Sequence, residues 1–291
     1  MSTAADSPWR PLRERLAGMT GERALVESVP EYMAWPLSKW LIRAIQHEEG
    51  PLDLATLVQL RLRRASGIGW DGNGRPYVML QGDELLEAID AALDIYSFLA
   101  ATEVRSRTFE HQWWGRLLKE LQSMLEHGGS AWKLNDDFNG LTRRVDETVS
   151  GAAQATMQAA PEDAASHLRR AWDATYGFNP DPTKAYSEAV KAVEAVVVPV
   201  TIPNDRVATL GKAIAHIKST AAKWSIAIDQ AGTPAPADAL LAMLGLVWHG
   251  QSDRHAGPNT APVTLESAQT ALHAAVTLVQ WFTSGAVKKS P

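Results

Sequence analysis

Apolar residues recur at helical spacing along most of the chain, and this pattern predicts a mainly helical protein. The clearest stretches carry leucine, isoleucine and tryptophan on one face and charged residues on the other. A glycine-rich segment, 67–76, interrupts the pattern and predicts a small hairpin or an irregular turn. A second short strand is expected over 131–134. The helices expected in this half of the chain span residues 11–19, 35–46, 54–64, 83–100 and 108–127.

The C-terminal half has a more regular pattern with better-marked helix ends. Asp181, Thr209 and Thr264 each stand just before an apolar periodic stretch, where a side-chain oxygen can cap a helix. Pro199 is expected to end the helix that starts after Asp181. The final helix, 265–282, is apolar over most of its surface, as expected for the centre of a bundle. After an alanine-rich stretch at 141–159, the expected helices span residues 161–177, 183–198, 210–218, 238–247 and 265–282.

These elements predict an all-α fold with minor β content. A length of 291 residues allows two domains. The helical pattern breaks after Gly128 and Gly129 and again at Asn135, so the boundary is placed there. We expect an N-terminal helical region of unknown role over 1–135 and a C-terminal helical domain over 136–291.

Composition narrows the classes of protein and of chemistry. Hydrophobic residues make up 45% and charged residues 21%, which is typical of a globular protein. The net charge of −5 gives no general attraction to nucleic acid or to an anionic membrane. The absence of cysteine excludes disulfides, thiolate metal sites and cysteine nucleophiles. No apolar run has the length of a signal peptide or a membrane span, so a cytoplasmic protein without a membrane partner is expected.

The best candidate for a working site is the segment Trp248-His-Gly-Gln-Ser-Asp-Arg-His-Ala-Gly-Pro-Asn, between two apolar helices. Arg254 can hold a phosphate or carboxylate through two hydrogen bonds, and His255 can act as a general acid or base. His249, Gln251 and Asp253 are candidate supporting residues that orient the pair. A structural alternative is that the aspartate, arginine and second histidine tie the bundle together as a polar plug.

No metal or cofactor site is expected. His249 and His255 lack a third ligand nearby in sequence, and no hydrolase serine motif or zinc-protease histidine motif is present. Outside the candidate segment, His216 and His273 are expected to be satisfied structural residues within helices. The other histidines, His167 among them, receive no role, and Glu188 with Lys191 is expected to form a surface ion pair.

Three segments of the C-terminal half together resemble a known domain. The first segment comprises Leu168-Arg-Arg-Ala-Trp together with residues 179–195. The second is Ala208-Thr-Leu-Gly-Lys-Ala-Ile, and the third is Leu246-Val-Trp-His-Gly-Gln-Ser-Asp-Arg-His-Ala-Gly. This region, roughly residues 140–285, resembles the C-terminal domain of abortive infection proteins, a member of the HEPN-like superfamily. The resemblance implies an antiparallel helical bundle, often dimeric. Active members are metal-independent ribonucleases of antiphage systems.

The same resemblance implies roles for two residues. In the superfamily, an arginine separated from a histidine by a few residues steadies the scissile phosphate, while the histidine moves a proton. Here Arg254 directly precedes His255. The upstream positions at which the superfamily spacing would place the arginine, Trp248 to Gly250, hold none. Two interpretations follow: a variant ribonuclease site acting on RNA, or a non-cleaving module used for dimerisation, sensing or binding. Both imply a homodimer or higher homo-oligomer in antiviral defence.

Overall fold

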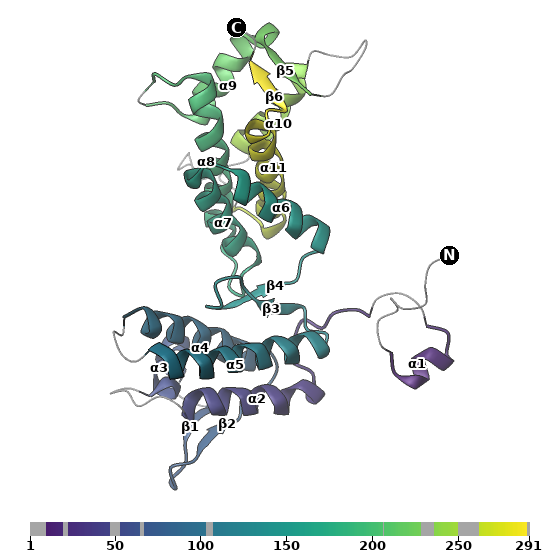
Figure 1. Cartoon of the computed structure of the whole chain (residues 1–291), viewed down its shortest axis with the longest axis vertical. Coiled ribbons are helices and arrows are strands. Elements are labelled where there is room, and N and C mark those ends of the chain that lie inside the picture. Colours follow the sequence, from purple (N-terminus) through teal and green to yellow (C-terminus); the bar gives the residue numbers. More distant parts are fainter. Residues whose placement is uncertain are drawn as a thin grey trace. The chain divides into compact units, whose positions relative to one another are not determined.

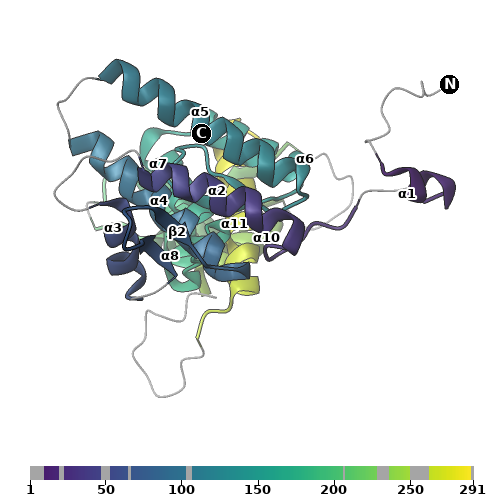
Figure 2. The same ribbon diagram turned by 90° about the horizontal axis from the view of Figure 1, so that it is seen from below.

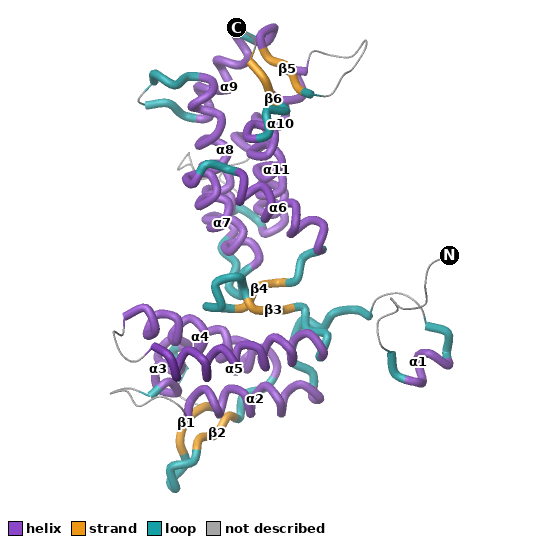
Figure 3. The backbone as a smooth tube through the Cα atoms, viewed as in Figure 1, coloured by secondary structure: helices purple, strands orange, loops and turns teal. Residues whose placement is uncertain are grey.

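A computed structural model of the chain describes residues 10–19, 23–46, 53–64, 67–102, 107–205, 207–227, 236–249 and 262–289. Helices dominate these residues, and the strands among them form three two-stranded pairs (Figures 1 and 3). The expected all-α fold class is therefore confirmed. No helix within the described ranges combines the length and the hydropathy needed to cross a bilayer. The chain divides into two compact units, Met1–Leu141 and Thr142–Pro291, whereas the sequence placed the boundary between residues 135 and 136.

In the first unit, helices α2, α4 and α5 pack together, α3 lies against α4, and the hairpin β1–β2 lies against α2 (Figures 1 and 2). The hairpin is antiparallel, and Ile68 pairs with Val78 across it. Of the two forms expected for the glycine-rich segment, a small hairpin or an irregular turn, the structure has the hairpin. The elements are α1 Leu12–Leu16, α2 Glu31–Gln46, α3 Leu54–Leu62, β1 Ile68–Trp70, β2 Pro76–Val78, α4 Gly82–Thr102, α5 Arg107–His127 and β3 Trp132–Leu134.

Large apolar side chains at helical spacing form the core of this unit. Trp40 of α2 is fully buried, and its indole N–H donates to the carbonyl of Leu117 in α5 at 2.7 Å. A buried indole N–H needs such a partner because an unpaired donor is costly away from water. Next to it, Trp114 stacks on Tyr96 with ring centroids 3.7 Å apart. These contacts join α2, α4 and α5.

In the second unit, α8 lies between α7 and α11 and packs along both. Helix α6 covers α7 and α11, α9 packs on α8 and α10, and the pair β5–β6 lies beside α10 and α11 (Figure 1). The elements are β4 Leu141–Arg143, α6 Glu147–Ala159, α7 Glu162–Tyr176, α8 Pro182–Thr201, α9 Leu210–Ser219, the 3-10 helix η1 Ala221–Lys223, β5 Trp224–Ile226, α10 Pro236–His249, α11 Leu265–Thr283 and β6 Val287–Lys289.

Three of the expected helix caps are confirmed in this unit. The side chain of Asp181 accepts from the N–H of Lys184, three residues into α8, at 2.9 Å. Thr209 and Thr264 make the equivalent bonds at the starts of α9 and α11. Each cap satisfies one backbone donor that has no partner inside its helix.

Small side chains let α8 approach its two neighbours closely. Alanine and valine dominate the buried face of α8, so the axes can come nearer than they could with leucine or phenylalanine. Apolar residues of α7 and α11 fill the space between, and burial of this surface is the main stabilising contribution. Besides Tyr186, the buried core residues of α8 are Ala185, Ala189, Val190, Ala192, Val193, Val196 and Val197.

Two prolines lie inside helices that were expected to begin or end beside them. Helix α2 starts at Glu31, one turn earlier than expected, and Pro36 is within it. Helix α8 continues through Pro199 to Thr201, so the expectation that Pro199 ends it is wrong. A proline removes one backbone hydrogen bond. Pro36 lies in the second turn of α2 and Pro199 in the last turn of α8, and the packing of the rest of each helix offsets the lost bond.

The carboxyl group of Asp90 in α4 is buried in the first unit. It accepts the backbone N–H of Leu141 at 2.7 Å, and a Cβ added at Gly140 would lie only 3.0 Å from the same oxygen. Burial raises the pKa of Asp90 from 3.8 to about 6, although the Leu141 hydrogen bond and the charge of Arg61 act in the opposite direction. Desolvation penalises the ionised form, so the folded protein favours the neutral carboxyl.

We predict that Asp90→Asn removes a pH dependence of stability. The pKa of Asp90 is raised in the folded state, so its contribution to stability is complete below about pH 4 and is lost as pH rises through about 6. The variant should gain about 1–3 kcal/mol of unfolding free energy at pH 7 relative to wild type and little at pH 4. Denaturant unfolding at both pH values checks this, with exposed Asp137→Asn as control. An equal effect at the two pH values would contradict it.

Candidate functional site

The structure places one of the five candidate site residues. His249 is the last residue of α10 and is exposed, so the helix runs further than expected and the linking segment begins after it. Gln251, Asp253, Arg254 and His255 lie outside the described residues. The chain is described again from residue 262, where Thr264 caps α11. The candidate segment therefore joins the last two helices that the structure describes.

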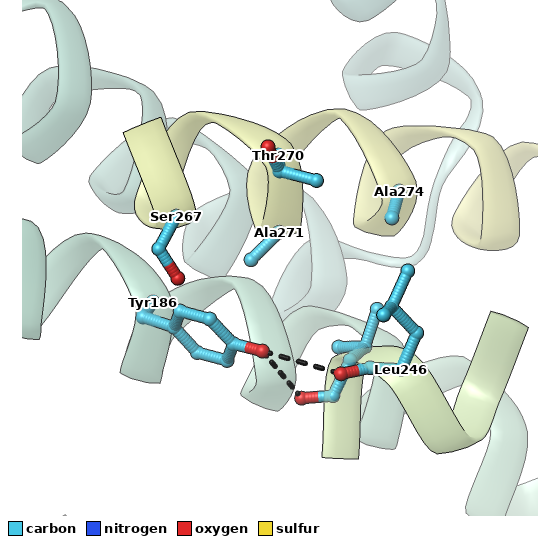
Figure 4. A pocket seen from close by; sticks show the side chains of 7 residues that line it. Tyr186, Leu246, Ser267, Thr270, Ala271 and Ala274 are labelled. Atoms are coloured by element: carbon cyan, nitrogen blue, oxygen red, sulfur yellow. Dashed lines mark hydrogen bonds between the residues drawn. The ribbon is translucent and has the colours of Figure 1, made fainter. Parts of the chain in front are cut away.

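Tyr186 of α8 holds the end of α10 from which this segment departs. Its hydroxyl donates to the carbonyl oxygens of Leu246 and Val247, at 3.3 and 3.2 Å (Figure 4). The last four carbonyls of a helix have no partner within it, and both of these belong to that group. The tyrosine therefore supplies the acceptors with a donor and fixes the final turn. The sequence groups Tyr186 with Glu188, Lys191 and Glu194 as polar residues of one helix, but it does not indicate this contact with α10.

The next residue, Trp248, is seated on α9. A Cβ added at Gly211 would lie 2.4 Å from an indole carbon of Trp248, so the ring rests directly on the first turn of that helix. Only glycine leaves room for this approach without a shift of backbone or ring. Tyr186 of α8 thus positions Leu246 and Val247, and Gly211 of α9 positions Trp248, at the end of α10.

A pocket of about 290 Å³ lies between α8, α10 and α11, next to the fixed turn. Most of its lining is apolar. Figure 4 shows Ser267 of α11 pointing toward Tyr186, and Leu246 is 62% exposed. The volume is near the lower end of small-ligand sites. The residues that line it are Tyr186, Leu246, Val247, Ser267, Thr270, Ala271 and Ala274.

A separate polar cluster lies between α7 and α8. Glu188 accepts from Lys191 Nζ at 2.6 Å and contacts His167 Nδ1 at 2.7 Å, and Arg170 Nε lies 3.1 Å from the same carboxylate. The expected pairing of Glu188 with Lys191 is confirmed, but the side chain of Glu188 is only 9% exposed. Its placement on the surface was therefore wrong, and His167, which received no role from the sequence, is part of this cluster.

The two other helical histidines differ from each other. His273 of α11 has a partner: the Tyr176 hydroxyl lies 2.7 Å from its Nε2. Burial raises the pKa of Tyr176 and lowers the pKa of His273, so both are neutral and the hydroxyl donates to the ring. The Nε2 atom of His216 is buried with no hydrogen-bond partner among the described residues, contrary to the expectation of a satisfied side chain.

Within the described ranges, no three histidine, aspartate or glutamate side chains gather as ligands of a metal ion would. The chain was also compared with protein-family models, curated proteins and solved structures, and none of them matches it. The resemblance to the abortive infection C-terminal domain therefore stays a prediction, carried by the three segments quoted above.

We predict opposite effects of alanine at two helical glycines. Gly211→Ala places a methyl group against the Trp248 ring and should lower the unfolding free energy by about 1–3 kcal/mol. Gly151→Ala lies in α6 with open space around it, so better helix propensity should raise stability by about 0.5–1 kcal/mol. Thermal and denaturant unfolding measure both. Stabilisation by Gly211→Ala would show that Trp248 does not rest on α9.

Proposed function

We propose that the second unit is an RNA-directed, HEPN-like domain of a cytoplasmic antiphage protein of the abortive-infection type. The observation that carries the proposal is the meeting of the three resembling segments at the end of α10. Tyr186 of the first segment bonds to Leu246 and Val247 of the third, and Gly211 of the second contacts Trp248. Residues far apart in sequence thus support one helix end, as expected when a scaffold positions a working segment.

The proposed chemistry is metal-independent cleavage of RNA by Arg254 and His255. The arginine binds the scissile phosphate, and the histidine accepts the proton of the 2′-hydroxyl. The 2′-oxygen then attacks phosphorus, and the bond to the 5′-oxygen breaks as that oxygen takes up the proton held by the His255 imidazolium. The products are a 2′,3′-cyclic phosphate and a 5′-hydroxyl end. His249, Gln251 and Asp253 orient this pair, and a second copy of the chain completes the cleft.

The pocket beside the α10 end supports RNA as the ligand. Single-stranded RNA exposes flat bases that proteins bind by apolar contact and edge hydrogen bonds. An apolar pocket of about 290 Å³ with a serine hydroxyl at its side fits that chemistry. We propose that it receives a base next to the bound phosphate.

A non-catalytic binding or dimerisation module is the second candidate. The observation in its favour is that Leu246 lies exposed at an apolar pocket, a combination that is frequent at protein contacts. The direct adjacency of Arg254 and His255 also favours it, because neighbouring side chains diverge. In this case the same surface binds RNA or a second copy without cutting.

We predict that the purified full-length protein cleaves RNA in the presence of EDTA. His255→Ala and Arg254→Ala should each lower the rate by about 100-fold or more, because a proton-transfer group or a phosphate ligand is lost. His127→Ala, an exposed histidine of α5, serves as the control and should keep the wild-type rate. End-group analysis of the fragments should give 2′,3′-cyclic phosphate.

Three results would separate the candidates. Cleavage that survives both substitutions would contradict the assignment of Arg254 and His255. RNA binding or dimerisation without cleavage would favour the non-catalytic module. Neither binding nor cleavage by the wild-type protein would overturn the RNA proposal.

A further inference from the structure

Glu188 is an ionised carboxylate at the interface of two packed helices. Burial pushes its pKa upward, but hydrogen bonds from Lys191 and His167 act more strongly in sum, and the pKa is below its ordinary value. Burying a charge is costly even when it is paired, and apolar residues often stabilise such a position as well. Stability alone therefore explains the cluster poorly. The cations around Glu188 are candidates to bind an anionic ligand.

The ionised carboxylate determines how His167 is protonated. An oxygen of Glu188 can only accept, so the imidazole Nδ1 must carry the proton that it donates across 2.7 Å. The 3.2 Å approach of an Arg170 terminal nitrogen to the same Nδ1 is then a contact between two donors. Nε2 makes no hydrogen bond to any described residue. Glu188 thus fixes the ring and leaves its second nitrogen for a ligand.

Most of the donor capacity around Glu188 is not used within the cluster. Arg170 donates its Nε–H to the carbonyl of Ser166 at 3.3 Å while the same nitrogen lies 3.1 Å from the carboxylate, and Lys191 uses one of its three N–H groups. The side chains of Arg170 and Lys191 are 50% and 49% exposed. Glu188 itself is almost covered. With neutral His167, two cations and one carboxylate leave a net charge of +1, and protonation of the ring makes it +2. An approaching anion meets the cations and not the carboxylate.

We propose that His167, Arg170 and Lys191 form a phosphate-binding site, with Glu188 as its buried positioning residue. Arginine and lysine suit phosphate because they offer several charged donors, and side chains already held in place lose less entropy on binding. The ligand is a phosphate group, carried by RNA or by a small phosphorylated molecule. The site involves none of the residues of the α10–α11 segment and does not depend on RNA cleavage.

A different outcome is expected if the cluster only joins α7 to α8. In that case removal of a cation changes stability, and phosphate leaves the His167 ring unaffected. If the cluster binds phosphate, the anion contacts the ring, and the imidazole NMR signals of His167 shift as phosphate is added. Besides Glu188, the charged groups that contact the ring in the structure are Arg170 on α7 and, through the shared carboxylate, Lys191 on α8.

The test is an NMR titration of the His167 imidazole in the full chain with inorganic phosphate, and then with a short single-stranded RNA. Phosphate should shift the imidazole NMR signals of His167 in wild type. Arg170→Ala and Lys191→Ala should each weaken binding by about tenfold or more, the effect of one charge-assisted hydrogen bond. Arg169→Ala is the matched control because Arg169 is equally exposed on the same helix but pairs with Glu162.

The results distinguish an RNA-backbone site, a site for a small phosphorylated molecule, and no phosphate site. Binding of phosphate and RNA that both cation variants weaken supports an RNA-backbone site, and binding of phosphate alone supports a small phosphorylated ligand. No response of His167 to either probe, or a response that the Arg169 variant weakens as much as the Arg170 variant, overturns the proposal. RNA cleavage by Arg254 and His255 is measured separately, so failure of one proposal leaves the other standing.

Discussion

The packing of α8 between α7 and α11 is the constraint on which the second unit depends. Alanine and valine on the buried face of α8 pack against α7 and α11, and burial of this surface stabilises the unit. A buried helix has little freedom to turn or slide. The side chains of α8 are therefore held in fixed positions, which is what a binding or catalytic site requires.

Two such side chains define the functional features of the unit. Tyr186 reaches α10 and satisfies carbonyls in its last turn, while Glu188 gathers one histidine and two cations toward α7. The first interaction prepares the start of the segment that carries Arg254 and His255. The second presents charged donors to solvent. A single helix thus supports the two proposed sites, which differ in chemistry.

Local signals in the sequence predicted much of the fold. The caps at Asp181, Thr209 and Thr264 and the glycine-rich hairpin depend on neighbours a few residues away, so pattern and composition were sufficient. The candidate site was harder because its supports are distant in sequence. An ion pair such as Glu188 with Lys191 has the same spacing on a covered face as on an exposed one, and only packing distinguishes them.

The most direct test of this account is amide hydrogen exchange in Tyr186→Phe. Loss of the hydroxyl leaves the carbonyls of Leu246 and Val247 without this donor and should cost about 1 kcal/mol locally. Exchange in the last turn of α10 should then be about fivefold faster, with α7 and the body of α8 unchanged. Unchanged exchange at the end of α10 would contradict the claim that α8 fixes the working segment.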